Sequence, residues 1–424
     1  GQKILTRSEG GNILKITSEG TNTEYADWQT AMEALKSGDE ITLLSKVILY
    51  EASGDKMPDK SCTINGDGKT LEFNTNGFVG SCSLQEDVTF KNIHLEAGNI
   101  TANGKKVVFD SGVIVKDNCD VYGGGGLGVD VETTSITIKD GATLSWVYGG
   151  GYAGKVTGNT NIVVEGGTVT AILGGGYNTE AIVEGSTNIT INNATFISTV
   201  YGGGNNAPVK GTANIKVENG NVNYIIGGGH NTSAICKNTN LEIIGGTFGK
   251  NDEYRYNVMG GGYSAPVEEK ATVTISGGTF NCFVTGGGGF DNETTATCGS
   301  TELNITGGTF NKWTYGGGWE SLVLETATVK VSGTPSLATL CGGGARSTAS
   351  CQNTDVQVSS NIGGWLFAGG ETGSVNGTAK LTVTSGSITK NIYGGGASAS
   401  CNKTEVTLSG GEVSGSVFGG GESG

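Results

Sequence analysis

Aromatic side chains recur at fixed positions beside a repeated run of three glycines, and rings so arranged can stack on the flat faces of sugars. They stand directly before the run, two residues further back, or directly after it, and these positions hold 16 of the chain's 30 aromatic residues (5 Trp, 13 Tyr and 12 Phe). Phe283 occupies one of these positions. The candidate ligand-binding residues are Tyr122, Trp146, Tyr148, Tyr152, Tyr177, Tyr201, Tyr224, Tyr263, Trp313, Tyr315, Trp319, Trp365, Phe367, Tyr393 and Phe418.

The two leading aromatic positions flank an aliphatic residue, as Trp146 and Tyr148 flank Val147. Because side chains alternate between the faces of a strand, an inward Val147 places both rings outward. We therefore expect lengthwise rows of exposed rings, with a glycine strip where another polymer approaches the backbone. The net charge of −14 favours a neutral or non-acidic glycan. Two structural explanations compete: the rings stack only on one another, or they point inward from a bulged strand.

Catalysis needs residues that this chain supplies sparsely. A lyase needs a base and cations beside the substrate's acid group, and a glycosidase needs paired carboxylates. Only three arginines and two histidines exist, and no two of the five aspartates from residue 121 onward share a predicted strand. Those aspartates are Asp130, Asp140, Asp252, Asp291 and Asp355. His230 and the inserted loop 250–256 around Arg255 are better explained as structural. We expect no catalytic residue.

Metal and cofactor sites are not expected either. The chain has no Cys/His cluster at zinc spacing and no regular acidic turn that would hold Ca²⁺. We therefore expect no metal and no cofactor.

The elements that must position the aromatic rings are set by the glycine triplets. Most triplets follow one another at 25 to 28 residues, a fixed period that indicates a solenoid. Segments before each triplet alternate with period two, as at Ile162/Val164 and Leu241/Ile243, and Gly-Gly-Thr turns follow them. Two or three short strands per repeat predict an all-β, single-stranded parallel β-helix. The triplets begin at Gly123, Gly149, Gly174, Gly202, Gly227, Gly260, Gly286, Gly316, Gly342, Gly394 and Gly419, with Ala368-Gly369-Gly370 in the gap.

The chain divides into three parts. Residues 1–60 form an N-terminal cap, in which the spacing of Tyr25, Trp28, Met32 and Leu35 predicts an amphipathic helix over about 24–37. We expect that helix to cover the open end of the sheet. Residues 61–120 form the first, irregular coils, and 121–424 form about 12 triplet-bearing coils. At about 4.8 Å per coil these 12 coils make a rod on the order of 50 Å long.

The N-terminal part carries a family resemblance. Residues 27–43, 64–71 (Ile-Asn-Gly-Asp-Gly-Lys-Thr-Leu) and 88–93 (Val-Thr-Phe-Lys-Asn-Ile) resemble the opening segments of right-handed β-helix proteins of the pectate-lyase-like superfamily. The triplet-bearing coils resemble glycine-rich repeats of bacterial surface proteins of adhesin type. The first resemblance implies a right-handed β-helix, and that superfamily includes lyases and glycosidases of polysaccharides. The family's paired-Asp and Gly-His-Gly signatures are missing here.

The composition of the chain limits the kinds of partner it can bind. With only 26 basic residues the chain is a poor partner for nucleic acid, and no run of 18 or more apolar residues spans a membrane. We expect an extracellular or cell-surface bacterial protein, a monomer, whose signal and anchor segments lie outside this sequence and whose natural chain continues past Gly424. The preferred function is non-catalytic binding of a polysaccharide or a host or cell-surface glycan. A polysaccharide lyase or hydrolase is the alternative, and a structural spacer is the third.

The cysteines number nine. Cys236, Cys298, Cys351 and Cys401 occupy one position in every second coil, so successive members lie about 9.6 Å apart, beyond the reach of a disulfide. We expect these four to be inward thiols. Cys62 and Cys82 have similar local sequences and could lie one coil apart, which makes them the best disulfide candidates.

Overall fold

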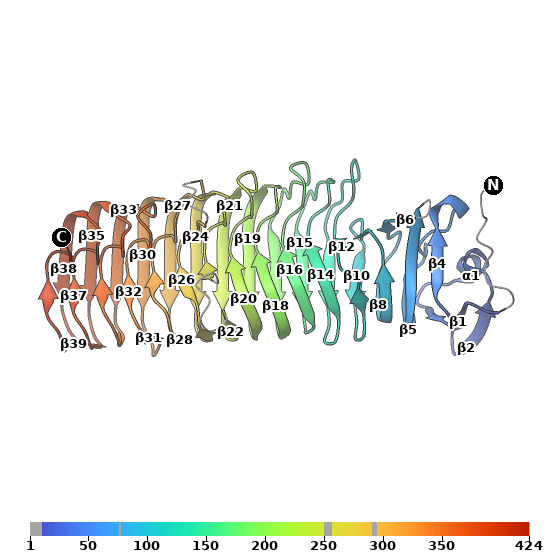
Figure 1. The fold of residues 1–424 in the computed structure, drawn as a ribbon, viewed down its shortest axis with the longest axis horizontal. Coiled ribbons are helices and arrows are strands. Elements are labelled where there is room, and N and C mark those ends of the chain that lie inside the picture. The colour runs from blue at the N-terminus through green and yellow to red at the C-terminus, as the bar shows by residue number, and fades with distance from the viewer. Residues whose placement is uncertain (1–10, 76–77, 250–256, 291–294, 424) are drawn as a thin grey trace.

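The chain folds into a long rod of stacked coils (Figure 1). The computed structural model describes residues 11–75, 78–249, 257–290 and 295–423. It is an all-β, right-handed parallel β-helix of about 14 turns, with one short helix at its N-terminal end. The fold class expected from the triplet period is therefore confirmed.

A first row of strands runs the whole length of the rod. Its members pair in parallel, and like residues stand opposite like residues: Ile162 pairs with Ile189, and Ile189 with Ile215. Successive coils therefore lie in register. The row contains β3 (Glu40–Leu43), β5 (Cys62–Thr75), β8 (Val88–Glu96), β10 (Lys106–Phe109), β13 (Ser135–Ile138), β15 (Thr160–Val164), β17 (Thr187–Ile191), β19 (Val209–Val217), β21 (Cys236–Ile243), β24 (Val267–Ile275), β27 (Cys298–Ile305), β30 (Val323–Val331), β33 (Cys351–Val358), β35 (Val375–Val383) and β38 (Cys401–Leu408).

A second row follows the Gly-Gly-Thr turns, and it also takes in parts of β5 and β8. Its inward rings stack along the rod, with Phe280 at 4.9 Å from Phe248 and 4.6 Å from Phe310 between ring centroids. The strands are β4 (Val47–Tyr50), β11 (Ile114–Val115), β14 (Thr143–Tyr148), β16 (Thr168–Leu173), β18 (Ala194–Tyr201), β20 (Gly220–Ile226), β22 (Thr247–Phe248), β25 (Thr279–Phe280), β28 (Thr309–Phe310), β31 (Ser336–Leu337), β36 (Ser387–Ile388) and β39 (Glu412–Val413).

A third row leads into the glycine triplets. In the middle of the rod β14, β16, β18 and β20 are long enough to serve both the second and the third row. The remaining strands of this row are β7 (Cys82–Ser83), β9 (Asn99–Thr101), β12 (Asp120–Tyr122), β23 (Asn257–Met259), β26 (Phe283–Thr285), β29 (Thr314–Tyr315), β32 (Leu340–Cys341), β34 (Leu366–Phe367), β37 (Ile392–Tyr393) and β40 (Val417–Phe418).

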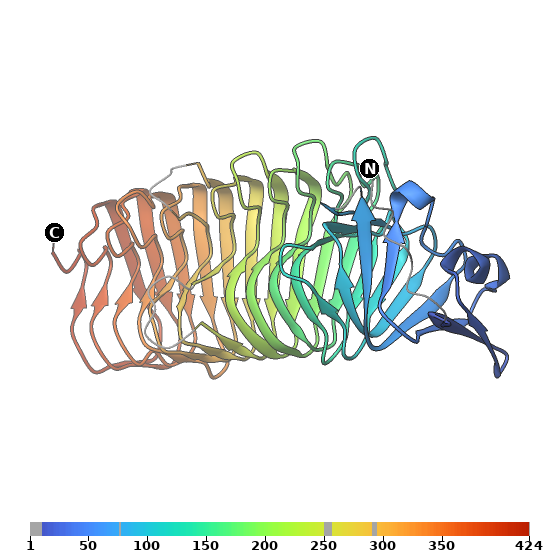
Figure 2. The same cartoon turned by 45° about the vertical axis from the view of Figure 1, so that its right-hand side comes forward.

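The N-terminal end is closed by a helix and an antiparallel hairpin (Figures 1 and 2). Strands β1 (Leu14–Ser18) and β2 (Thr21–Tyr25) pair with each other, and β1 also pairs antiparallel with β3. Helix α1 (Trp28–Ala34) packs Trp28 and Ala31 into the end of the core, where both are buried. A 3-10 turn, η1 (Glu51–Ser53), and a short strand, β6 (Phe78–Val79), which pairs antiparallel with β5, complete this end. The expected capping role of the helix is confirmed.

The helix is shorter than the predicted span of 24–37. It begins after Asp27, whose carboxylate accepts a hydrogen bond from the backbone N–H of Thr30 at 2.8 Å and so caps the first turn. Tyr25 before it belongs to β2, and Leu35 after it has extended backbone (ψ 136°), which ends the helix. Side-chain spacing found the helix but could not locate these two ends.

Candidate functional site

The aromatic residues beside the triplets lie outside the main core, as strand alternation predicts. In β14, Val147 belongs to the main core, whereas Trp146 and Tyr148 belong to a second apolar cluster on the other face of the strand. The register repeats along the rod, with Tyr122 opposite Tyr148 and Tyr148 opposite Leu173. We call the rings of this second cluster the aromatic file. It comprises Tyr122, Trp146, Tyr148, Tyr177, Tyr201, Tyr224, Tyr263, Phe283, Phe290, Trp313, Tyr315, Trp319, Phe367 and Tyr393.

The expectation that these rings form an exposed row is wrong for most of them. The chain turns back after each triplet and lays the next residue over the outer face of the strand. Tyr177 does so by donating its backbone N–H to Gly151 O at 3.0 Å, and its ring meets that of Tyr148 edge-on at 5.6 Å. The file is therefore a second core. Its buried members are Tyr122, Tyr148, Tyr201, Tyr224, Tyr315, Trp319, Phe367 and Tyr393.

Stacking of like rings accounts for part of the file. Phe367 and Tyr393 stack at 4.9 Å with an interplanar angle of 8°, and Tyr393 stacks on Phe418 at 5.0 Å. Burial also raises the pKa of the phenols of Tyr122 and Tyr315 well above the usual range, so both stay neutral donors. The competing explanation, that the rings mainly stabilise one another, holds for these buried members.

A subset of the predicted rings keeps accessible surface. Tyr152, Trp365 and Phe418 are exposed, at 38%, 36% and 43%, and Phe418 owes its exposure to its place in the last coil. Trp146, Tyr177, Tyr263, Phe283 and Trp313 are half-buried, each packed against the buried rings with one part still open. These partly open rings are where a ligand could make contact.

The glycine triplets are not the open strip expected from the sequence. They stack directly on the triplets of the next coil: a Cβ on Gly175 would lie 2.7 Å from the backbone N of Gly204, and Gly175 donates its own N–H to Gly203 O at 3.0 Å. Neither the backbone angle φ of Gly175 nor that of its neighbour Gly174 lies in the left-handed region. Glycine is required here because the coils approach too closely for any side chain.

A small third core lies against the other side of the triplets. A Cβ on Gly203 would come within 2.7 Å of the sulfur of Cys236, and Gly317 stands in the same relation to Cys351 at 2.8 Å. A threonine hydroxyl donates to the first triplet carbonyl, in successive coils at Thr134, Thr160 and Thr187 and in alternate coils from Thr239 on, as Thr301 does to Gly316 O at 2.7 Å. The triplets are thereby packed and hydrogen-bonded from within, which leaves no backbone strip for a ligand.

From β19 onward this third core alternates between two kinds of coil, whereas Val156, Val183 and Val209 stack directly on one another nearer the N-terminus. Cys236, Cys298, Cys351 and Cys401 are each paired with valines of the neighbouring coils, as Cys298 is with Val267 and Val323. Coils with cysteine carry the threonine three residues later, whereas coils with valine carry an alanine four residues later and a register shift. The predicted inward position of the cysteine column in every second coil is confirmed.

The candidate disulfide between Cys62 and Cys82 is not formed. Cys62 lies in β5 opposite Val88, whereas Cys82 lies in β7 of another row, opposite Ile100. Similar flanking residues therefore place them on different sides of the coil. All nine cysteines are free, and eight are buried.

Three tryptophans and three cations surround the most distinctive depression on the aromatic file. This cavity, of about 560 Å³, lies over the coils of β29, β32 and β34. Trp313 and Trp365 flank it, with ring centroids 6.5 Å apart although they stand two coils apart. The coil between them carries Thr339 in place of an aromatic residue, which leaves the space open. We call this the tryptophan hollow. Its lining includes Trp313, Trp319, Arg346, Trp365, Glu371 and Lys390.

Polar groups in the tryptophan hollow are held in place by its rings. The guanidinium carbon of Arg346 lies 4.6 Å from the ring centroid of Trp319, and the ammonium nitrogen of Lys390 lies 5.8 Å from that of Trp365. Tyr315 reaches across two coils and donates its hydroxyl to Oε2 of Glu371 at 2.6 Å. The hollow thus presents aromatic faces together with oriented charges.

A second depression lies nearer the N-terminus on the same file. This cavity, of about 370 Å³, is lined by Trp146, Tyr148 and Tyr177 together with Asp120 and two asparagines. Burial raises the pKa of the Asp120 carboxyl, and the hydroxyl of Tyr122 donates to its Oδ2 at 3.2 Å, which opposes that rise. We call it the tyrosine hollow. It repeats the combination of rings and polar groups without a cation in its lining.

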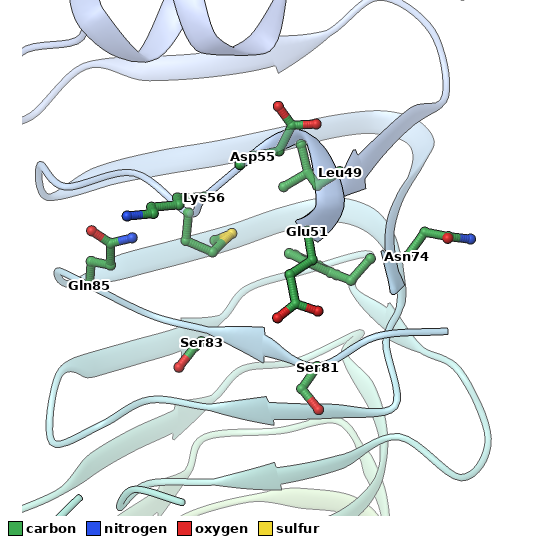
Figure 3. Close-up of a pocket in the computed structure, with 11 residues that line it drawn as sticks. Leu49, Glu51, Asp55, Lys56, Asn74, Ser81, Ser83 and Gln85 are labelled. Atoms are coloured by element: carbon green, nitrogen blue, oxygen red, sulfur yellow. The ribbon is translucent and has the colours of Figure 1, made fainter. Parts of the chain in front are cut away.

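A third depression, of about 400 Å³, lies beside the N-terminal cap, away from the aromatic file (Figure 3). Leu49, Met57 and Phe73 line it as buried apolar residues. Figure 3 shows Lys56 and Gln85 together at one end, apart from Asn74 at the other. Sequence reasoning missed this depression because it is made by the η1 loop crossing the strands, and no repeat marks it.

A carboxylate beside the third depression and His230 on the aromatic file both take part in local hydrogen bonding. Asp55, beside the third depression, accepts hydrogen bonds from Tyr50 N and Gln29 Nε2, which braces the loop. His230 lies between the rings of Tyr201 and Tyr263 at 5.0 and 5.2 Å, with Nδ1 2.9 Å from Asn205 Oδ1. Among residues 11–75, 78–249, 257–290 and 295–423, no three His, Cys, Asp or Glu side chains gather as metal ligands would. Asp252, Asp291 and the loop containing Arg255 lie outside the described residues.

Comparisons with family models, with curated proteins and with solved structures found no match to this chain. No helix within the described part of the chain has the length and apolar character needed to cross a membrane.

Proposed function

We propose that this chain is a non-catalytic binding protein that holds a glycan along the aromatic file. The tryptophan hollow carries the proposal, because there partly open rings of Trp313 and Trp365 stand beside oriented polar groups. Binding sites for small molecules and polymer units combine apolar walls with a few placed polar groups in this way. The tyrosine hollow offers a second contact on the same file, so one extended polymer could touch both.

The competing functions find less support in the residues. A spacer accounts for the buried rings, since these stabilise the rod, but it gives no reason for Trp365 to keep 36% of its surface exposed beside a cavity. A lyase or hydrolase needs a base and an acid facing one substrate. In the tryptophan hollow the lining carboxylate, Glu371, is already engaged by Tyr315. The proposal places the protein outside the cell or on a bacterial surface, where such polymers are met.

Affinity electrophoresis through gels that contain a panel of neutral and acidic polysaccharides tests the proposal. We expect at least one polymer to retard the wild-type chain, and Trp313→Ala with Trp365→Ala to abolish that retardation. Loss of a tryptophan anchor at the centre of an interface costs about 2 kcal/mol, or about 30-fold in affinity. Leu324→Ala is the matched control, because Leu324 is 57% exposed at the start of β30, outside both hollows.

A wild-type chain that migrates freely through every gel would leave the spacer as the better explanation. Release of reducing or unsaturated sugar from any of the polymers would instead support the enzyme. Retardation that survives both tryptophan substitutions would move the binding surface away from the tryptophan hollow.

A further inference from the structure

The charge of the tryptophan hollow is opposite to that of the whole chain. The chain carries a net charge of −14. The lining of the hollow nevertheless contains Lys312, Arg346 and Lys390 against one carboxylate, Glu371. Solvent and salt screen charges beyond about 8 Å at physiological ionic strength. A bound group therefore responds mainly to these local cations.

Two of these cations, Arg346 and Lys390, lie over aromatic rings rather than beside carboxylates. Lysines elsewhere in the rod often pair with carboxylates, as Lys330 does with Glu302 at 2.9 Å. In the part of the chain that the structure describes, neither Arg346 nor Lys390 has a carboxylate within 4.0 Å. Each lies over an indole ring instead. Contact with a ring face orients a cation while its N–H donors stay available to another partner.

The single carboxylate of Glu371 leaves the net charge of the lining of the tryptophan hollow positive. The hydroxyl of Tyr315 donates to Glu371 at 2.6 Å, which occupies part of the carboxylate. Arg346 and Lys390 are both exposed side chains, so a ligand can reach them. They come from different coils, Arg346 after the triplet at Gly342 and Lys390 before the triplet at Gly394. Both line the same cavity as Trp313 and Trp365.

We infer that the tryptophan hollow binds an acidic unit of a glycan, with a carboxylate or sulfate group held by Arg346 and Lys390 and the sugar ring against Trp313 and Trp365. This inference rests on the proposed glycan binding and names the class of unit bound. It replaces the neutral glycan expected from the net charge, because that expectation ignored where the cations gather. The tyrosine hollow, which is lined by Asp120 and has no lysine or arginine among its lining residues, fits a neutral unit of the same polymer.

The test compares short oligosaccharides of matched length by isothermal titration calorimetry with the full chain. The probes are uronic-acid oligomers, the neutral oligomers made by reducing their carboxyl groups, and sulfated neutral oligomers. We expect the acidic probes to bind at least about tenfold more tightly than the reduced ones, because reduction removes the charge-assisted hydrogen bonds to Arg346 and Lys390. Preference for the uronic or for the sulfated probe identifies the acidic group.

Charge-removing variants complete the design. Arg346→Gln and Lys390→Gln should each weaken acidic probes about tenfold and leave the reduced probes unchanged. Lys330→Gln is the matched control, because it removes the same charge from a lysine outside the hollow. Circular dichroism confirms that each variant folds.

Each outcome bears on a separate claim. Equal binding of acidic and reduced oligomers, still lost in Trp313→Ala, would overturn the acidic unit and leave glycan binding standing. Binding of acidic probes that survives both Arg346→Gln and Lys390→Gln would overturn the assignment of the two cations. No binding of any probe, together with free migration through every gel, would overturn both proposals.

Discussion

Replacing Gly175 with alanine should destabilise the rod although it adds only one methyl group. The new Cβ would lie 2.7 Å from the backbone N of Gly204, against about 3.4 Å for ordinary contact. The two coils would have to separate locally by about 0.7 Å, because a backbone atom, unlike a flexible side chain, has no alternative rotamer. The Gly175 N to Gly203 O hydrogen bond, now 3.0 Å, would then exceed a normal hydrogen-bond length.

The change in the free energy of unfolding combines two destabilising effects and one stabilising effect. Overpacking costs about 1–3 kcal/mol and a stretched backbone hydrogen bond about 1 kcal/mol. Alanine restricts the unfolded chain more than glycine does, which returns about 0.4–1 kcal/mol. We therefore expect Gly175→Ala to lower the free energy of unfolding by about 1–4 kcal/mol.

The rod supplies its own controls. Gly420 occupies the same triplet position in the last coil, where no further described coil covers it, and a Cβ there meets nothing within 4 Å. Gly126 lies in the loop after the first triplet and is equally unobstructed. Neither has a left-handed φ, so alanine at either site should be neutral or slightly stabilising.

Urea unfolding followed by circular dichroism measures the three variants. Amide hydrogen exchange over residues 149–204 adds a local readout, because a solenoid can unfold coil by coil. If Gly175→Ala matches the wild type in both measurements, the coils are not packed closely enough to require glycine, and steric exclusion is the wrong explanation of the triplets.

Three further predictions concern the inner structure. Thr301→Val removes the buried hydroxyl that donates to Gly316 O at 2.7 Å and should lower the free energy of unfolding in urea by about 1–2 kcal/mol. An unchanged urea midpoint would show that this hydrogen bond does not stabilise the rod. Hydrogen bonds from two lysines lower the pKa of Glu302 from 4.5 to about 2. The stability that the ionised Glu302 contributes is therefore complete above about pH 4.5 and is lost as the pH falls toward 2. Glu302→Gln should lower the free energy of unfolding by about 1 kcal/mol at pH 7, after allowance for screening, and change nothing near pH 2. Burial raises the pKa of the Cys351 thiol to about 12. A thiol reagent should therefore modify the half-buried Cys401 first in the native chain, and Cys351 only after unfolding, as mass spectrometry would show. Early labelling of Cys351 would contradict its buried position.

The repeat architecture could be predicted from the sequence because each coil repeats the same pattern of apolar and glycine positions. The alternation at Ile162/Val164 and its repetition specify an inward file, and the structure pairs Ile162 with Ile189, and Ile189 with Ile215, in register. The capping helix followed from the spacing of Trp28 and Leu35. Its ends did not, since they depend on the cap at Asp27 and on the hairpin before it.

The candidate site was predicted only in part. Alternation correctly placed Tyr148 on the face opposite Val147, but a period of two says nothing about what covers that face. The cover comes from the chain after each triplet, whose path depends on contacts between coils, such as that of Tyr177 with Gly151. The tryptophan hollow depends on the small Thr339, which stands three residues before its triplet, where Trp313 and Trp365 stand before theirs. The sequence shows this interruption but does not show that it opens a cavity. The pairing of Cys62 and Cys82 failed because similar flanking residues do not fix a row.

The alternation of Cys–Thr coils with Val–Ala coils makes two windings, rather than one, the natural unit of length in the C-terminal half of the rod. Val323 fills the space between the thiols of Cys298 and Cys351, and its coil takes one additional residue to do so. Removing a single winding there would bring two Cys–Thr coils or two Val–Ala coils together and would break this alternation. Changes in rod length by whole pairs of windings, about 9.6 Å each, preserve the fit.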